Sequence, residues 1–563
     1  ANTTASDNVA MGKSALAANT TGHSNVSIGK DSMIGSLTGD GNTALGFKAL
    51  FTNNGSTPDH NVAIGRQALY SNTTGTVNTA VGLNASYSNT TGTCNVAIGR
   101  NALYSTTTGY KNVSMGAAAL YTNTEGYENV AIGDTALYSN TTGVENTAVG
   151  CGALYTNTTA HANTAIGRAA LRLNTTGTKN VALGRNALCA NTTANCNVAV
   201  GWQTMCTNTE GHSNTAVGIN ALFANTTGDK NVAIGIEALL TNTTASENTA
   251  VGRRALRLNT TGHSNIAVGT EALDANTTGV RNTAVGYQAL YAHTEGSDNV
   301  AVGYTALDNT TTGSDNVAVG NNAMDANTTG SSNTAIGHNA LLAKTTGGDN
   351  VAVGTGALQA LTTAVNATAI GEQAGCRMTT GGGNTFLGKR AGNNITTGAN
   401  NIFVGYLNTA AAVDNAQTIV IGINTVGKGT NTGFMNANGG GNYAGNNSAD
   451  WSTTSDRRIK KNIVDNNIGL EKIEKIRVRN FEYRTKEEIT EVPSNAAIKV
   501  EGIQLGAIAQ EIEENIPEMV KTESTGVKTL ETGNLTWYLV NAVKELSETN
   551  KKLTSRIEEL EKK

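Results

Sequence analysis

Apolar and polar residues recur with one fixed period along the first three quarters of the chain. Each unit begins with Asn, then Val or Thr, Ala, an aliphatic residue or Met, and Gly, as in 231–235. Two variable residues, Ala-Leu, two further variable residues, Asn-Thr-Thr-Gly and a last variable pair complete it. The Gly at the fifth position recurs from Gly12 to Gly422 with a period of 17, with one exception, which makes 25 units. A short fixed period of this kind predicts a solenoid.

The length of the unit limits what each coil contains. Seventeen residues are too few for the helix pairs of helical repeats, so we expect a coil of two short strands and two turns. Side chains alternate between the faces of a strand, so the second and fourth positions of the unit share one face. We expect the second position, Val or Thr, to be partly buried, and the small Ala and Gly face to lie close to another backbone. We place in the core the fourth position and the Leu of the Ala-Leu pair, that is Met11, Ile28, Leu45, Ile64 and Val81 with Leu69, Leu103, Leu120 and Leu137.

Stacked coils bring identical positions together. At about 4.8 Å per coil, 25 coils make a rod of roughly 120 Å. The Asn and Thr positions are expected to form ladders, with Asn-Thr-Thr-Gly closing a turn; a Thr surface that orders ice-like water and glycosylation of Asn-Thr-Thr are less favoured. One step, from Gly46 to Gly65, is longer than the others by two residues and contains Pro58, so we expect these two to bulge outward. Cys189 and Cys206 lie one period apart, as ladder thiols within reach of a disulfide.

Composition divides the chain near Ser455. Only 15% of the 563 residues are charged, yet 39 of the 82 charged residues lie in 455–563, whereas all seven histidines and all six cysteines precede that segment. The expected domains are a repeat shaft over 1–422, a Gly/Asn-rich neck or linker over 423–454, and a small α+β domain over 455–563. The fold class is therefore mainly β. The net charge of −4 argues against nucleic-acid binding, and no apolar run approaches a membrane span. We expect no cofactor, no metal and no membrane insertion.

The charged segment has mixed patterns. Residues 470–476 have helical spacing, 478–484 alternate like a strand, and 506–520 read as a strand followed by a helix that stops at Pro517. A long helix is predicted over 539–563. Its apolar residues alternate steps of four and three, which is a coiled-coil seam formed by Leu539, Val543, Leu546, Asn550, Leu553, Ile557 and Leu560. The seam Asn often favours two strands, which conflicts with a trimer.

Two families of fibrous proteins have repeats like these. The Asn-Val-Ala-Ile-Gly and Asn-Thr-Ala-Val-Gly elements resemble the head repeats of trimeric adhesins of the YadA type. That resemblance implies parallel β-rolls, left-handed in that family, assembled as homotrimers. The 17-residue unit with its Asn-Thr-Thr-Gly turn is more similar to the repeat shafts of phage-type tail fibres. The adhesins end in a membrane anchor, which this sequence does not show.

The segment 455–563 resembles the intramolecular chaperone domain of phage tail spikes and fibres, the peptidase S74 family. Three blocks carry the resemblance: 455–463 (SDRRIKKNI), 506–520 (GAIAQEIEENIPEMV) and 539–546 (LVNAVKEL). The resemblance implies a trimerising domain that guides fibre chains into register and then releases itself. It also implies cleavage of the Thr454–Ser455 bond, with Ser455 as the nucleophile and Lys460 as its base.

The residues themselves agree with a Ser–Lys pair at one point. No histidine follows His338, so a Ser-His-Asp triad within this domain is excluded, and a serine paired with a lysine is a known alternative. On pattern alone, the cationic cluster of Arg457, Arg458 and Lys461 around Lys460 is equally typical of a solvated surface. The resemblance favours the catalytic interpretation.

The sequence thus predicts a homotrimeric tail fibre of a virion, assembled in the host cytoplasm, that binds a glycan or protein of the host cell surface. Any catalysis is a single self-cleavage, and no enzyme that turns over a substrate is expected. A bacterial trimeric surface adhesin and a glycan-degrading tail spike are the alternatives. The spike would need paired carboxylates about 5–10 Å apart in a cleft. Most acids of the shaft, such as Glu125, Glu210, Glu247 and Glu295, occupy turn positions instead.

Overall fold

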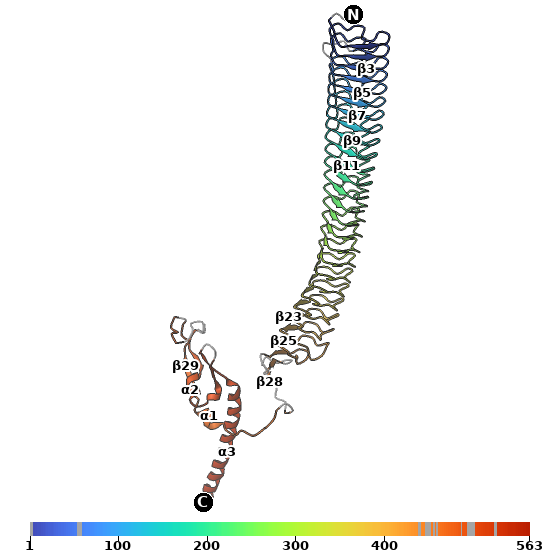
Figure 1. The fold of residues 1–563 in the computed structure, drawn as a ribbon. Helices are drawn as coiled ribbons and strands as arrows, with labels where there is room; N and C mark the ends of the chain where they lie inside the picture. The colour runs from blue at the N-terminus through green and yellow to red at the C-terminus, as the bar shows by residue number, and fades with distance from the viewer. Residues whose placement is uncertain are drawn as a thin grey trace. The chain divides into compact units, whose positions relative to one another are not determined.

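The computed structural model describes residues 4–52, 59–436, 441–444, 452–453, 457, 460–485, 487–491, 501–522 and 526–563. The chain forms two compact units, residues 1–454 and 455–563 (Figure 1).

The first unit is a parallel β-solenoid of 25 coils, as the period predicts. Each coil contributes one short strand, and each strand pairs with the strand of the next coil. We number the coils by these strands, which are β1 Val9–Met11, β2 Val26–Ile28, β3 Thr43–Leu45, β4 Val62–Ile64, β5 Thr79–Val81, β6 Val96–Ile98, β7 Val113–Met115, β8 Val130–Ile132, β9 Thr147–Val149, β10 Thr164–Ile166, β11 Val181–Leu183, β12 Val198–Val200, β13 Thr215–Val217, β14 Val232–Ile234, β15 Thr249–Val251, β16 Ile266–Val268, β17 Thr283–Val285, β18 Val300–Val302, β19 Val317–Val319, β20 Thr334–Ile336, β21 Val351–Val353, β22 Thr368–Ile370, β23 Thr385–Leu387, β24 Ile402–Val404 and β25 Ile419–Gly422.

Register is exact from coil to coil. Val62 of β4 pairs with Thr79 of β5, which holds the same position in the next coil, and this one-period offset continues to β25. The longer step before β4 does not disturb it, because Thr43 of β3 still pairs with the equivalent Val62. The predicted bulge at Pro58 lies outside the described residues.

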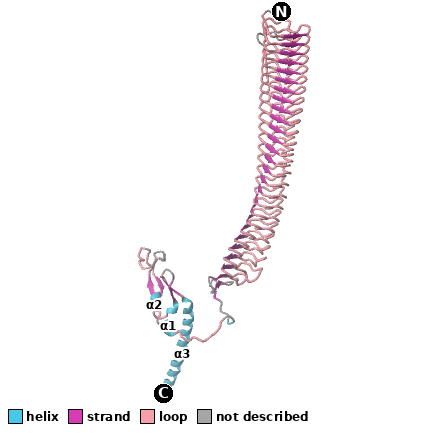
Figure 2. Cartoon of the chain, in the orientation of Figure 1, coloured by secondary structure: helices cyan, strands magenta, loops and turns pink. Residues whose placement is uncertain are grey.

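The expectation of two strands per coil is wrong. Figure 2 shows a single column of strands along the shaft, with loops and turns making up the rest of each coil. The Ala-Leu half of the coil cannot extend, because two of its residues have left-handed backbones. In coil 4 these are Gln67, with φ of 60°, and Leu69, with φ of 48°. Such residues break an extended strand.

The prediction of which strand face is buried is also wrong. From coil 2 onward it is the third position, usually Ala, that is fully buried. The fourth position faces outward, as Met11, Ile28, Leu45, Ile64 and Val81 are all exposed or half-exposed. The reason is space: Ala and Leu of the eighth and ninth positions, such as Ala68 and Leu69, fill the coil from the opposite wall. The burial predicted for the Leu residues is confirmed, as is the partial burial of the second position.

Two ladders of buried asparagine run inside the coils, as predicted. In the first-position ladder, the backbone N–H of Asn78 donates to Oδ1 of Asn61 at 3.0 Å, while its Nδ2 donates to the carbonyl of Gly92 at 2.8 Å. In the twelfth-position ladder, Nδ2 of Asn89 donates to Oδ1 of Asn72 at 2.7 Å and to the same Gly92 carbonyl at 3.1 Å. The ladders therefore hydrogen-bond neighbouring coils to one another and close each turn.

The close backbone contact predicted for the small residues occurs at the fifth-position glycines. Gly65 has φ of 130°, and a Cβ placed on it would lie 2.4 Å from the carbonyl oxygen of Gly82 in the next coil. Both the conformation and the contact therefore require glycine at this position.

The last coils exchange large and small residues across the core. Phe386 and Phe403 replace the third-position Ala, and Gly375 and Gly392 replace the ninth-position Leu. A Cβ on Gly392 would lie 2.2 Å from the ring of Phe386, so the ring occupies the volume that leucine fills elsewhere.

The region expected as a neck contains further strands. They are β26 Gly433–Asn436, β27 Gly441–Ala444 and β28 Ser452–Thr453. Strand β26 pairs in parallel with β25, β27 pairs antiparallel with β26, and β28 pairs antiparallel with β27.

The second unit is a small α+β domain. Its elements are α1 Leu470–Glu474, β29 Arg479–Phe481, β30 Gln504–Gly506, α2 Ala509–Glu513, the 3₁₀ helices η3 Pro517–Met519 and η4 Thr532–Asn534, β31 Val520–Thr522, β32 Lys528–Leu530 and α3 Leu535–Glu561. β29 pairs with β30 and β31 with β32, both antiparallel. Its core is Ile512, Ile516, Met519 and Tyr538. Helix α3 begins four residues before the predicted start, because Leu535 and Tyr538 of its first turn pack on this core.

Candidate functional site

The predicted catalytic residues lie where the second unit begins. Lys460 is described and exposed, and its backbone N–H donates to the carbonyl of Arg457 at 3.2 Å. Thr454 and Ser455 lie outside the described residues. The pairing of Ser455 with Lys460 therefore stays a prediction.

The chain after Lys460 is an exposed arm, residues 461–468, that leads into α1 and contacts helix α3. Nδ2 of Asn541 donates to the carbonyl of Asn466 at 2.7 Å, and a carboxylate oxygen of Glu545 accepts from the backbone N–H of Leu470 at 3.1 Å. Gly469 is buried against the helix, where an added Cβ would lie 2.2 Å from the backbone nitrogen of Ala542. Helix α3 thus fixes the end of the arm that carries Lys460.

The sequence contains the two residues of α3 that make this contact, but their pattern does not predict it. The block 539–546 includes Asn541 and Glu545, and it supports the resemblance to the chaperone family. Its pattern predicts a helix with an apolar seam, but polar residues beside a seam are ordinary surface residues in any helix. Only the fold shows that two of them bind the backbone of the arm.

A polar cluster ties α1, η3 and α3 together. Glu518 accepts hydrogen bonds from Lys472 and from the hydroxyl of Tyr538, the latter at 2.9 Å. The ammonium group of Lys472 also lies 4.9 Å from the centre of the Tyr538 ring. The hydrogen bond from Lys472 lowers the pKa of Glu518 to about 2. The cluster holds α3 against the small domain, and with it the contacts to the arm.

A groove of about 620 Å³ in this unit is lined by residues 481–484, at the end of β29, and by residues 526–530, which include β32. Phe481, Tyr483, Ala507 and Leu530 are among the residues that line it. Among the described residues, no three His, Cys, Asp or Glu side chains gather as a metal site would require.

Apart from Asn550, the predicted seam of α3 is apolar, and a single chain leaves about half of it exposed. Leu539, Val543, Leu546, Leu553, Ile557 and Leu560 are 45–64% exposed. Within the described ranges, no helix has the length and apolar content of a bilayer-spanning segment.

Comparison with known proteins gives one match. Residues 455–521 match the family described as Chaperone of endosialidase (Peptidase_S74). The match starts at Ser455, the first residue of the second compact unit. Neither the curated proteins nor the solved structures contain a significant match to the chain. The second unit therefore carries a chaperone-of-endosialidase domain, and a 25-coil β-solenoid followed by such a domain fits a tail fibre or tail spike with a C-terminal chaperone.

Proposed function

We propose that the chain is the shaft of a homotrimeric virion tail fibre, which attaches to a glycan or protein of the host surface. Its C-terminal domain aligns three chains during assembly and then cuts itself off at Thr454–Ser455. The observation that carries the proposal is the family match that starts at Ser455, directly after a long repetitive β-structure.

The outer face of the shaft strands supports association along the whole shaft. The fourth-position residues form an apolar column on this face, and Ile234, Val268 and Ile336 in it are 37–40% exposed. The fully buried small residues lie on the opposite, inner face of the same strands. A continuous apolar column that a single chain leaves in water favours burial against further copies of the chain.

The seam of α3 supports the same association at the C-terminal end. Its apolar residues follow the heptad spacing of a coiled coil and are exposed in one chain. Each unit thus has one exposed apolar surface, and association with two further copies of the chain would bury both surfaces.

The cleavage chemistry follows from a Ser–Lys pair. The amine of Lys460, in its neutral form, takes the proton of the Ser455 hydroxyl as Oγ attacks the carbonyl carbon of Thr454. The peptide bond to Ser455 breaks, its nitrogen takes a proton, and an ester joins Thr454 to Oγ. Water then hydrolyses this ester, which leaves a shaft that ends at Thr454 and a domain that begins at Ser455.

Native mass measurement tests the assembly. For the uncut Ser455→Ala chain we expect three times the chain mass of 57.8 kDa, and for the cut chain three copies of fragment 1–454. Ile234→Asp combined with Val268→Asp should weaken the trimer, because both charges would be buried at the interface. Val77→Asp is the control, since Val77 is 54% exposed but lies outside the strand face. A stable monomer of the uncut Ser455→Ala chain, at 57.8 kDa, would contradict the proposal.

A gel of freshly expressed protein tests the cleavage. The unaltered chain should give two fragments, 1–454 and 455–563, and Ser455→Ala and Lys460→Ala should each give an uncut, assembled trimer. Lys461→Ala is the matched control and should cut at nearly the normal rate. If the assembled chain stays uncut, the domain is a retained chaperone. If Lys461→Ala blocks the cut and Lys460→Ala does not, the base is misassigned.

A further inference from the structure

The tenth residue of each coil forms a column on the wall of the shaft. From Tyr70 in coil 4 to Tyr155 in coil 9 the column is tyrosine, and successive ring centres lie 4.9–5.2 Å apart. Side chains at this position in consecutive coils are therefore in direct contact. In coils 11 and 12 the same position is occupied by Cys189 and Cys206.

The two cysteines are held in register by the backbone around them. The N–H of Ala190 donates to the carbonyl of Cys206, and the N–H of Leu188 donates to that of Thr204, both at 3.0 Å. The thiol of Cys189 donates to the carbonyl oxygen of Cys206 at 3.2 Å. Both thiols are free and half-buried. The coil spacing of about 5 Å lies within the Cα separations that a disulfide bond spans.

The pair is also suited to thiol exchange. A hydrogen bond from the Cys206 thiol lowers the pKa of Cys189 to about 7, and the positive charge of Arg172 acts in the same direction. The pKa of Cys206 is raised, because its thiol is the one that donates to the neighbouring sulfur. A half-buried rather than fully buried position, a stabilised thiolate and an adjacent second thiol all favour thiol–disulfide exchange.

We propose that Cys189 and Cys206 are a thiol–disulfide site, which a small disulfide such as oxidised glutathione converts into a covalent link between two consecutive coils. The Cys189 thiolate attacks one sulfur of oxidised glutathione, which forms a mixed disulfide and releases one glutathione thiolate. Cys206 loses its proton to solvent and attacks the Cys189 sulfur, which releases the second glutathione thiolate. Two protein thiols are oxidised, and one disulfide is reduced to two thiols.

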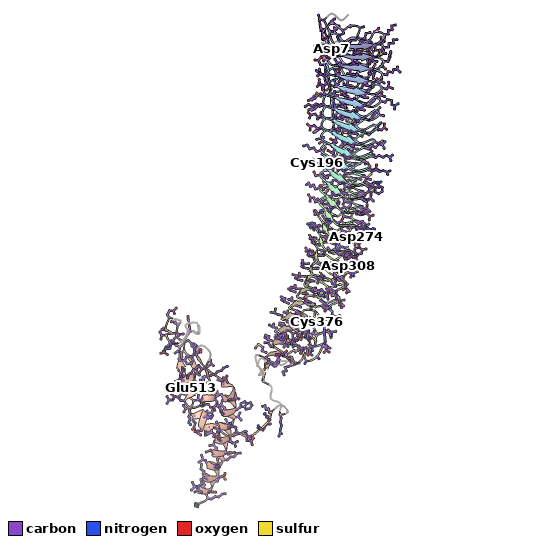
Figure 3. The ribbon with its side chains drawn as sticks, viewed as in Figure 1. Asp7, Cys196, Asp274, Asp308, Cys376 and Glu513 are labelled. Atoms are coloured by element: carbon purple, nitrogen blue, oxygen red, sulfur yellow. The ribbon has the colours of Figure 1, made fainter. Side chains whose placement is uncertain are left out.

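Other cysteines of the shaft lack such a neighbour in their own column. Cys196, labelled in Figure 3, is exposed, and its column places Lys179 and Ser213 in the adjacent coils. Exchange at Cys196 therefore stops at the mixed disulfide. It is a built-in control, because Cys189, Cys196 and Cys206 fall in one tryptic peptide, residues 186–230.

The test uses the full chain in buffers of oxidised and reduced glutathione. Free thiols are blocked with N-ethylmaleimide, and peptide 186–230 is mapped by mass spectrometry before and after reduction. In reduced buffer we expect N-ethylmaleimide on all three cysteines of the peptide. In oxidising buffer we expect none on Cys189 or Cys206. Its mass should fall by two hydrogens for the internal bond, and Cys196 should carry a label or one glutathione.

Variants separate the proposed bond from general thiol reactivity. Cys196→Ser should keep the internal bond, whereas Cys189→Ser and Cys206→Ser should each leave a single cysteine that takes a label or glutathione. Labels on both Cys189 and Cys206 in oxidising buffer would overturn the proposal. So would glutathione on both, or a bond from either of them to Cys196.

Discussion

Replacing His293 with asparagine should stabilise coils 16 and 17. His293 occupies a twelfth position, which is usually Asn, and is fully buried. It donates through Nε2 to the carbonyl of Gly296 at 2.7 Å, but its Nδ1 has no hydrogen-bond partner within the described structure. Oδ1 of Asn276, one coil earlier, also lacks one there, because a histidine offers no amide to the ladder. An asparagine at position 293 would donate through Nδ2 to Oδ1 of Asn276. This bond is equivalent to the one that Asn89 makes to Asn72.

The size of the effect depends on pH. Restoring one buried hydrogen bond contributes about 1 kcal/mol at pH 8. Burial lowers the pKa of His293 below its ordinary value of 6.5, so below pH 6.5 the unfolded chain takes up a proton that the folded chain refuses. The stability of the unaltered shaft therefore falls as the pH drops through 6.5. At pH 5 this adds up to about 2 kcal/mol, at about 1.36 kcal/mol for each pH unit.

Hydrogen–deuterium exchange of the amides of coils 16 and 17, corrected for intrinsic rates, measures the difference. For His293→Asn we expect exchange about fivefold slower at pH 8, and a larger slowing at pH 5, of up to about 150-fold. His161→Asn, at an exposed position, should change neither value. Equal slowing at both pH values would refute the protonation argument, and unchanged exchange at pH 8 would refute the ladder argument.

Three further predictions concern the shaft. Lys344 is fully buried at another twelfth position, and burial lowers its pKa to about 8, so Lys344→Met should raise the thermal midpoint at pH 7. That advantage should shrink from pH 8 to 10.5, because the folded lysine loses its proton before the unfolded one; an advantage that grows would contradict it. Phe386→Ala should destabilise its coil by about 3–5 kcal/mol, measured by local hydrogen exchange. Adding Gly375→Leu should recover part of this loss by refilling the core. A leucine fits the backbone there, because Leu358, at the same position one coil earlier, has φ of 49°. Inserting one residue after Ala182 should abolish assembly in native mass measurement, because the residue that follows would swap faces; deleting two residues within 53–58 should leave trimers intact.

The period was enough to predict the solenoid, its number of coils and its ladders, because each follows from which residues recur at one spacing. It was not enough to decide which strand face is inside. Alternation places Ala63 on one face of the strand and Val62 and Ile64 on the other. Because large apolar residues are usually the buried ones, the pattern favoured the wrong face. The sequence did hold a contrary signal. The fourth position varies in size from Val to Met, whereas the third is nearly always Ala or Ser, as a narrow interior requires.

The C-terminal domain was predictable in a different way. Helices α1 and α3 and strand β29 follow from local patterns, and its family from three blocks, whereas the β31–β32 ribbon was not predicted. The contacts of Asn541 and Glu545 with the arm were not predictable, since they join segments far apart in the sequence and depend on how α3 lies on the domain.

The uniformity of the coils has a consequence for how the three chains of the proposed trimer would find one another. If one chain slid along its partners by a single coil, Val and Ile would still meet Val and Ile, and all but the end coils would keep a neighbour. Such staggered alignments differ little in energy over most of the shaft, and a chain caught in one would escape only by separating many coils. The correct alignment must therefore be chosen before the coils close, at a place that occurs once in each chain. The coils of Phe386 and Phe403 and the heptads of α3 are such places. The first lie in the last coils of the repeats, and the second follow the repeats in sequence. Assembly that starts there and proceeds toward the N-terminus would align the remaining coils without any of them having to be distinguishable.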